Sequence, residues 1–207
     1  MSNRISPLHL ALLLLVVIVF LWSAWRPYDR ATWWLEVAPA LIGGAILIST
    51  YSHFRFTTLV YTLVALHMIL LCVGGHYTYA RVPLFQWLEP IFGWHRNHFD
   101  RLGHFMQGLV PALVARELFV RLRVVNSAGW RFAIIILICM GISALYELLE
   151  WATALIAGAA ANAFLGTQGD PWDTQQDMFM ALLGALCALL FFSYWQNRQM
   201  RTLPSRW

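Results

Sequence analysis

No lysine occurs anywhere in the chain, and charged residues of all kinds make up only 12% of its 207 residues. Hydrophobic residues account for 60%, so a water-soluble fold would have too little polar surface to cover itself. The formal charge of +4 comes entirely from arginines that are scattered between apolar stretches. This distribution indicates membrane topology and argues against a nucleic-acid partner.

The sequence also lacks the signatures of several enzyme classes. It has no His-Glu-x-x-His zinc motif, no Gly-x-Ser-x-Gly nucleophile elbow and no phosphate-binding loop. Its cysteines, Cys72, Cys139 and Cys187, lie inside apolar stretches, where we expect small buried side chains instead of nucleophiles. Any catalysis is therefore expected to use water activated by a metal ion, or acid–base chemistry by carboxylates and histidine.

Apolar stretches of membrane-spanning length recur along the chain. Each is close to the ~20 residues with which a helix crosses the ~30 Å hydrocarbon core, and the apolar residues do not alternate as in a membrane β-barrel. We therefore predict an all-α polytopic membrane helix bundle that forms a single integral domain over residues 1–207. Its six transmembrane helices are placed at residues 8–25, 35–51, 57–74, 104–120, 131–151 and 177–195.

The arginines favour one orientation across the membrane. With the N-terminus inside, eight arginines fall in inner segments and five in outer ones, as expected from the enrichment of positive charge in cytoplasmic loops. Both termini are therefore predicted to be cytoplasmic. The inner set is Arg4, Arg55, Arg121, Arg123, Arg131, Arg198, Arg201 and Arg206, and the outer set is Arg26, Arg30, Arg81, Arg96 and Arg101.

Two of the outer segments, 75–103 and 152–176, are long and rich in polar and aromatic residues. Prolines at both ends of residues 83–90 predict a short re-entrant or interfacial helix in the first of them. Residues 155–164 are small and apolar, so they either extend the fifth helix or pack closely against a neighbour.

The first group of unusual residues lies at the entry to the fourth span. If a helix begins near Phe99, then Asp100, His104 and Gln107 share one face at positions i, i+4 and i+7. Such a face can present a carboxylate and an imidazole to one metal ion or one polar substrate. The alternative is that Asp100 caps the helix and pairs with Arg96 or His104.

The second group lies at the outer end of the fifth span, where Glu147 and Glu150 share a helix face at positions i and i+3. Two ionised carboxylates at membrane depth repel one another and resist desolvation, so they need a cation, an arginine or a shared proton. The alternative is that Glu150 lies in the headgroup region while Glu147 pairs with an arginine.

The third group leads into the sixth span. Asp173 is expected to cap this helix with Asp177 one turn further on, and the glycines and proline before them allow a tight loop that aims Asp170 at the same place. These acids need an external cation, or Arg96 and Arg101 from the other loop. The alternative is a solvated acidic loop.

All three groups fall on the same side of the membrane in the topology that the arginines predict. We therefore predict one pocket at the ends of the fourth, fifth and sixth spans. His76 and His98 are further candidates for this pocket, and the sequence leaves open whether they belong to it. Oxygen-rich ligation with imidazole suits a divalent ion such as Zn²⁺, Mn²⁺, Fe²⁺ or Mg²⁺. The predicted metal ligands are Asp100, His104, Glu147, Glu150, Asp173 and Asp177.

These motifs resemble those of the YjdF-type bacterial inner-membrane proteins over most of the chain. The resemblance is carried by residues 96–105, by Tyr146-Glu147-Leu-Leu-Glu150-Trp151 and by Gly169-Asp170-Pro-Trp-Asp173-Thr-Gln-Gln-Asp177. It implies a location in the bacterial inner (plasma) membrane and brings no activity with it. The paired glutamates and the spaced aspartates after them are also similar to those of VanZ-like membrane proteins, which are linked to glycopeptide-antibiotic tolerance.

The function that follows is a metal-dependent membrane enzyme, a hydrolase in class, acting on a lipid or lipid-linked anionic substrate at the outer face. Glu150 and His104 are the predicted catalytic residues, while Arg96, Arg101 and Gln107 are predicted to bind the substrate. Two alternatives stay open. One is a cation- or proton-coupled transporter, and the other is a non-catalytic lipid-binding or resistance protein.

Overall fold

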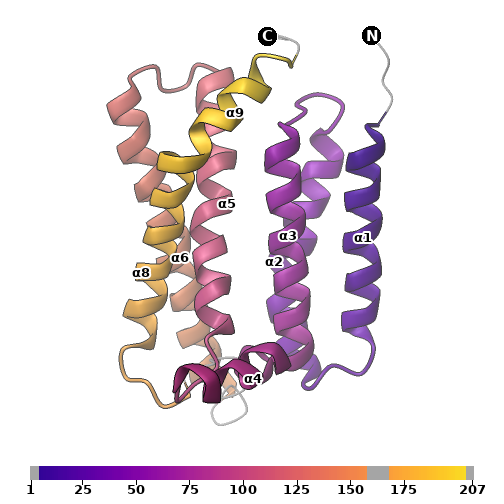
Figure 1. Cartoon of the computed structure of the whole chain (residues 1–207), viewed down its shortest axis with the longest axis vertical. Coiled ribbons are helices and arrows are strands. Elements are labelled where there is room, and N and C mark those ends of the chain that lie inside the picture. The colour runs from indigo at the N-terminus through magenta and orange to yellow at the C-terminus, as the bar shows by residue number, and fades with distance from the viewer. Residues whose placement is uncertain (1–4, 158–167, 204–207) are drawn as a thin grey trace.

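The computed structural model describes residues 5–157 and 168–203, and every regular element in these ranges is a helix. Long helical segments run side by side as a bundle (Figure 1). This arrangement confirms the predicted all-α bundle. The segments are α1 (Pro7–Ala24), α2 (Arg30–Thr50), α3 (Thr58–Tyr77), α5 (Phe99–Arg121), α6 (Ala128–Ala157) and a last one in which α8 (Asp173–Cys187) continues through the π-helix η3 (Ala188–Phe192) into α9 (Ser193–Met200).

Both termini lie at one end of the bundle, which we call the terminal end, and the short helix α4 (Pro83–Phe92) lies across the other, the α4 end (Figure 1). Helix α4 confirms the helix predicted between the prolines, and the single turn η1 (Tyr79–Arg81) connects it with α3. Helix α6 extends to Ala157, as one of the two alternatives expected, while residues 158–164 lie outside the described part of the chain.

Local signals in the sequence explain where several helices begin and end. The Asp29 carboxylate accepts a hydrogen bond from the Thr32 backbone N–H at 2.7 Å and so caps α2. Pro83 begins α4, and Gly93, with a φ of 66°, ends it in the left-handed conformation that glycine adopts without strain. These helix ends can therefore be identified from the local sequence, without knowledge of tertiary contacts.

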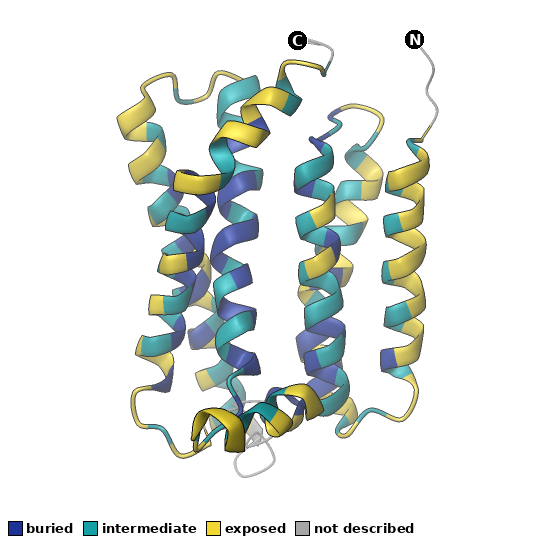
Figure 2. Ribbon diagram, in the orientation of Figure 1, coloured by how far each residue is buried: buried dark blue, intermediate teal, exposed yellow. Residues whose placement is uncertain are grey.

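Five of the helical segments are long and apolar enough to cross a membrane, and α5 is the exception. It begins at Phe99, five residues before the predicted span, and its 23 residues reach about 35 Å, which is enough to cross the hydrocarbon core. Figure 2 shows α5 largely buried, whereas α1 is mostly exposed. Because α3, α6 and α8 pack around α5, its polar residues face protein instead of lipid.

Helices α5 and α8 approach each other through glycines. A Cβ atom on Gly108 would lie 1.8 Å from the Ala181 carbonyl oxygen, and one on Gly184 would lie 1.9 Å from the Phe105 carbonyl oxygen. Only hydrogen fits at these two positions, so the backbones touch directly, as they do at small-residue interfaces in membranes. This contact fixes the register that determines which polar side chains of α5 face α8.

A buried polar network holds the terminal end together. The Glu117 carboxylate is fully buried and accepts hydrogen bonds from the Thr57 backbone N–H at 2.9 Å, the Thr57 hydroxyl at 2.7 Å and the Arg121 guanidinium at 2.8 Å. The Gln196 amide donates to both Glu117 and the Leu113 carbonyl. Both oxygens of this carboxylate accept hydrogen bonds from the protein. The network therefore has a structural role and connects α3, α5 and α9.

Replacing Glu117 by glutamine is expected to lower the free energy of unfolding by about 2 kcal/mol, because the amide has one acceptor oxygen where the carboxylate has two. The measurement is thermal unfolding of the purified variant in detergent. Glu89→Gln is the control, since Glu89 lies on the short helix α4, none of whose residues is buried. Equal stability of the two variants would contradict a structural role for Glu117.

Candidate metal centre

The α4 end of the bundle brings together acids and a histidine from three helices. Asp100 and His104 come from α5, Glu147 from α6 and Asp177 from α8. All four side chains are buried, with exposed fractions between 2% for Asp177 and 8% for Glu147. The close α5 and α8 contact explains part of this meeting, because His104 lies one turn before Gly108 and Asp177 one turn before Ala181.

The distances among these side chains fit a shared ion. The His104 Nε2 atom lies 3.5 Å from an Asp100 carboxylate oxygen and 3.8 Å from Glu147 Oε1. One ligand atom from each of Asp100, His104 and Asp177 lies within 4.8 Å of the other two. Ligand atoms bound at ~2.1 Å around a tetrahedral ion are about 3.4 Å apart, so small side-chain shifts would complete such a site.

Gln107 orients the imidazole of His104. Its Oε1 atom lies 3.0 Å from His104 Nδ1, an arrangement in which Nδ1–H donates to the amide oxygen. In the neutral tautomer with this hydrogen bond, the other ring nitrogen, Nε2, carries a lone pair, and its polar neighbours are carboxylate oxygens. A metal-binding histidine commonly has this form, with one nitrogen held by a hydrogen bond and the other free to bind.

Two carboxylate oxygens in the same place lack hydrogen bonds. Glu147 Oε1 and Asp177 Oδ1 are buried, and neither accepts a hydrogen bond in the described part of the chain. Arg101 Nε lies 3.1 Å from Asp177 Oδ1 without the alignment of a hydrogen bond. Buried carboxylate oxygens without donors are costly unless a cation or a proton meets them.

The two arginines of the predicted substrate site are engaged by aspartates from the loop before α8 and from α8 itself. Arg101 Nη2 lies 3.1 Å from Asp170 and 3.2 Å from Asp173, and Arg96 contacts the same two carboxylates. The loop therefore aims Asp170 at the site, as predicted. The prediction that Asp173 caps α8 is wrong: the N-cap is Trp172, and the Asp173 carboxylate turns to Arg96 instead.

Asp170 stays ionised across the physiological pH range. A hydrogen bond from the Trp172 backbone N–H at 2.9 Å, followed by the contact with Arg101, holds the pKa of Asp170 below its ordinary value of 3.8. A carboxyl whose pKa is lowered on folding contributes stability above its ordinary pKa and loses it as the pH falls through the lowered value. The loop contacts with Arg96 and Arg101 therefore persist at any pH above about 4.

The α4 end has more acidic groups than basic ones to neutralise them. Seven carboxylates gather there, and two arginines contact them, so five formal negative charges are left over. Such an excess in a buried region requires external cations, protons or both. The seven are Glu36, Asp100, Glu147, Glu150, Asp170, Asp173 and Asp177.

A cavity of about 190 Å³ adjoins the candidate ligands. Asp100 and His104 form part of its wall, and on another side the Tyr146 hydroxyl donates a hydrogen bond to the buried Glu36 carboxylate at 3.0 Å. The remaining polar lining residues are His67, Tyr79, Gln107 and Glu150. Glu150 faces this cavity together with Asp100 and His104.

Neither Glu36 nor His67 was among the residues predicted for the site, yet both line the cavity. The signal for Glu36 was present, because it is an acid six residues inside the apolar helix α2, the same kind of position that singled out Glu147. Neither His76 nor His98 joins the cluster. His76 Nδ1 lies 3.0 Å from the Ser23 carbonyl oxygen, and the His98 ring packs on Trp94.

A bundle of membrane-spanning helices with an acid-rich site buried at one end defines a polytopic membrane protein. Residues 8–198 match the model of a family described as "Predicted membrane protein (DUF2238)". The chain is also 45% identical over 202 residues to "Inner membrane protein YjdF" of Escherichia coli strain K12, a match that covers 97% of each chain. No solved structure matches the chain.

The chain therefore belongs to this family of membrane proteins, and the resemblance to YjdF-type proteins is confirmed. The name of the relative places that protein in the inner membrane of its bacterium.

Proposed function

We propose that the chain is a metal-dependent membrane enzyme, a hydrolase in class, that acts on a lipid or lipid-linked anionic substrate. One observation carries the proposal: His104 Nε2, with its partner nitrogen held by Gln107, faces the carboxylates of Asp100 and Glu147 at 3.5 and 3.8 Å. A neutral imidazole would turn its Nε2 lone pair toward these carboxylates, so the arrangement calls for a cation at Nε2. A divalent ion there would be bound by all of these groups, whereas a proton would join His104 to only one carboxylate.

The ligands in this proposal are Asp100, His104, Glu147 and Asp177. Three carboxylates with one imidazole favour Zn²⁺, Mn²⁺ or Fe²⁺ over Mg²⁺, which prefers oxygen ligands and retains its water. Asp173 then acts as the counter-ion of Arg96 and Arg101 instead of as a ligand, because its carboxylate contacts both arginines.

The cavity beside the ligands supports a substrate that enters from the membrane. Exposed Pro39 on α2 and exposed Ile142 on α6 line it together with the buried Asp100 and His104. The cavity therefore extends from the lipid-facing surface between α2 and α6 to the candidate ligands. A substrate with an apolar chain could keep that chain in the bilayer while its polar group reaches His104.

The residues around the cavity have separate tasks in this scheme. A bound ion would supply a Lewis acid and a water molecule whose pKa is lowered to about 7. Glu150 accepts the proton of the attacking water as general base, and the Tyr146 and Glu36 pair offers a hydroxyl and a carboxyl to the leaving group. Because Arg96 and Arg101 are held by Asp170 and Asp173, an anionic headgroup would be bound by the ion and not by these arginines.

We place this site at the outer face of the membrane, with both termini in the cytoplasm. Eight arginines in the inner segments against five in the outer ones support this orientation.

The contact pattern along α5 weighs against transport through the bundle. Leu113, Ile135 and Cys139 are 0% exposed and belong to one apolar core between the α4-end site and the Glu117 network. Within the described part of the chain, an ion or proton crossing the bundle would have to pass these closely packed apolar side chains. We therefore expect sealed vesicles containing the protein to show no flux of protons or divalent ions above that of empty vesicles.

The proposed activity is tested with purified protein and vesicles of phosphatidylethanolamine and phosphatidylglycerol. The protein is stripped with a chelator, reloaded with Zn²⁺, Mn²⁺, Fe²⁺ or Mg²⁺, and the lipids are analysed by mass spectrometry. We expect a hydrolysed lipid that depends on the ion and falls at least about 100-fold in Glu150→Gln, the scale of a lost general base. Unchanged lipids with every ion would reject turnover of phospholipids, and ion flux would favour the transporter.

A further inference from the structure

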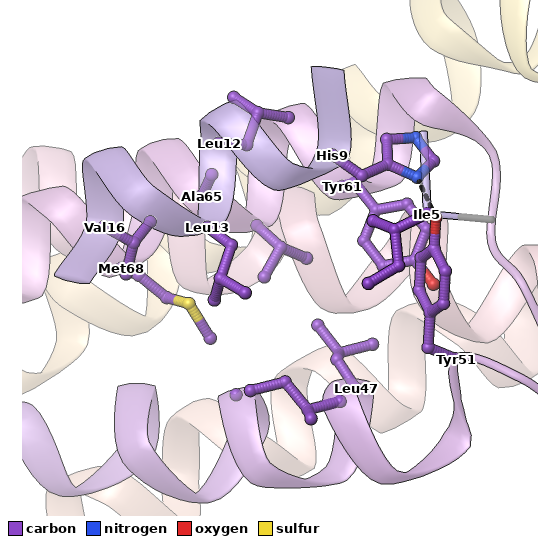
Figure 3. Close-up of a pocket in the computed structure, with 13 residues that line it drawn as sticks. Ile5, His9, Leu12, Leu13, Val16, Leu47, Tyr51, Tyr61, Ala65 and Met68 are labelled. Atoms are coloured by element: carbon purple, nitrogen blue, oxygen red, sulfur yellow. Dashed lines mark hydrogen bonds between the residues drawn. The ribbon is translucent and has the colours of Figure 1, made fainter. Parts of the chain in front are cut away.

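A second cavity lies at the terminal end, remote from the candidate metal centre. Its volume is about 190 Å³, and its walls come from α1, α2 and α3. Figure 3 shows His9, Tyr51 and Tyr61 close to one another at one end of the cavity, with Val16 and Met68 toward the other end. Its lining is almost wholly apolar apart from the histidine and the two tyrosines. The full set is Ile5, His9, Leu12, Leu13, Val16, Gly44, Leu47, Ile48, Tyr51, Tyr61, Val64, Ala65 and Met68.

The cavity exists because α1 and α2 are joined at the α4 end and both pack on α3. The Trp33 indole N–H donates to the Ser23 hydroxyl at 3.1 Å, which links the two helices there. Toward the terminal end, Leu13 on α1 and Ile48 on α2 line the cavity and remain 39% and 62% exposed. The cavity is therefore a cleft that faces the lipid surrounding the bundle.

Polar groups at the end of the cleft satisfy one another. His9 Nδ1 lies 2.8 Å from the Tyr51 hydroxyl, and His9 Nε2 lies 3.1 Å from the Thr58 hydroxyl. Just beyond them, the Arg55 guanidinium stacks over the Tyr51 ring at 4.5 Å. A positive charge and hydrogen-bonding groups thus lie at one end of the cleft, and the rest of the cleft is apolar.

We propose that this cleft binds one acyl chain of an anionic phospholipid, with the phosphate near Arg55. From His9 to Val16 the cleft follows α1 for about 10 Å, and Ile5, two residues before the helix, extends it to roughly the depth of one leaflet, half of the ~30 Å hydrocarbon core. Water gains little in an apolar cavity, whereas an acyl chain fills it without losing hydrogen bonds. Arg55 on the rim selects a headgroup with net negative charge.

Gly44→Leu tests the occupant directly. A Cβ at Gly44 would meet only the flexible Met68 methyl group, at 3.4 Å, so the larger side chain enters the cleft without touching backbone. The matched control is Gly141→Leu on α6, where a Cβ meets nothing within 4 Å. Both substitutions add the same apolar side chain to an apolar helix, and only the first fills the cleft.

The readout is native mass spectrometry of delipidated protein titrated with phosphatidylglycerol or phosphatidylethanolamine. We expect one phosphatidylglycerol per chain in the unmodified protein and in Gly141→Leu, and at least about tenfold weaker binding in Gly44→Leu. Arg55→Gln should retain lipid binding but lose the preference for phosphatidylglycerol. Thermal unfolding of each variant in detergent shows that the bundle is intact.

Equal phosphatidylglycerol affinity in Gly44→Leu and Gly141→Leu would overturn the proposal. So would a dimer that forms without lipid and is lost in Gly44→Leu, because a second copy of the chain would then occupy the cleft. The cleft and the metal centre lie at opposite ends of the bundle, so either proposal can fail while the other stands.

Discussion

Asp177→Asn is expected to abolish divalent-metal binding by the purified protein, while Asp170→Asn leaves it intact. Asp177 belongs to the trio whose ligand atoms lie within 4.8 Å of one another, and its Oδ1 accepts no hydrogen bond from residues 5–157 or 168–203. Asp170 is the matched control because it contacts Arg101, as Asp177 does, but stands outside the trio. The amide keeps the shape of the carboxylate and removes its charge, on which binding of a divalent ion depends.

The measurement is elemental analysis after dialysis against each ion, combined with thermal unfolding. We expect about one ion per unmodified chain, the stoichiometry of a single four-ligand site, and less than about a tenth of that in Asp177→Asn. At a metal concentration 100 times the Kd, the unmodified protein should gain about 2.7 kcal/mol of stability that the variant lacks.

In the presence of a chelator, Asp177→Asn is expected to have the opposite effect on stability. Without a bound metal ion, Asp177 adds one more negative charge to a cluster in which carboxylates already outnumber arginines. Removing that charge therefore relieves electrostatic repulsion. Asp177→Asn should therefore unfold at the same temperature as the unmodified protein in chelator, or at a higher one. Lower stability of the variant under both conditions would mean that Asp177 is a structural partner of Arg101, and the metal centre would be rejected.

The position of the site was predictable because its residues repeat with the helical period near the ends of apolar spans. Asp100, His104 and Gln107 share a face of α5 that begins at Phe99, as their spacing indicated. The spans and the arginines then placed that face beside Glu147 and Asp177. Local spacing and membrane topology are both encoded within short stretches of sequence, so neither required knowledge of tertiary contacts.

What the sequence did not reveal depends on contacts between distant segments. Asp173 has the residue type and position of a cap, yet Arg96, 77 positions away, supplies a stronger partner than the backbone. Glu36 lies on α2, and only the fold brings it to Tyr146, 110 positions further on. Long-range pairs of this kind cannot be inferred from periodicity, because periodicity describes one helix at a time.

Gly108 and Gly184 carry no pattern that singles them out, since glycine within a helix is locally only unfavourable. Their role becomes visible when α5 and α8 are placed together, with the Gly108 Cα against the Ala181 carbonyl and the Gly184 Cα against that of Phe105. The proposed metal centre depends on this contact. His104 lies one turn before Gly108, and Asp177 lies one turn before Ala181. The separation of α5 and α8 at this contact therefore sets the distance between the two candidate ligands.

Gly108→Ala is therefore expected to damage both the fold and the site. The added methyl group would lie 1.8 Å from a backbone oxygen, which cannot rotate away as a side chain can, so α5 and α8 must move apart. We expect a loss of about 3 kcal/mol in the free energy of unfolding, at the upper end of the cost of overpacking. Thermal unfolding in detergent measures this loss, and elemental analysis of the surviving protein should show reduced metal.

Gly141→Ala on α6 is the matched control, because a Cβ there meets nothing within 4 Å and the change improves helix propensity equally. It should unfold at or slightly above the temperature of the unmodified protein and retain its ion. If Gly108→Ala were as stable as this control, the backbones of α5 and α8 could not be in contact. If it were destabilised yet bound metal normally, the register of the two helices would not determine the distance between His104 and Asp177.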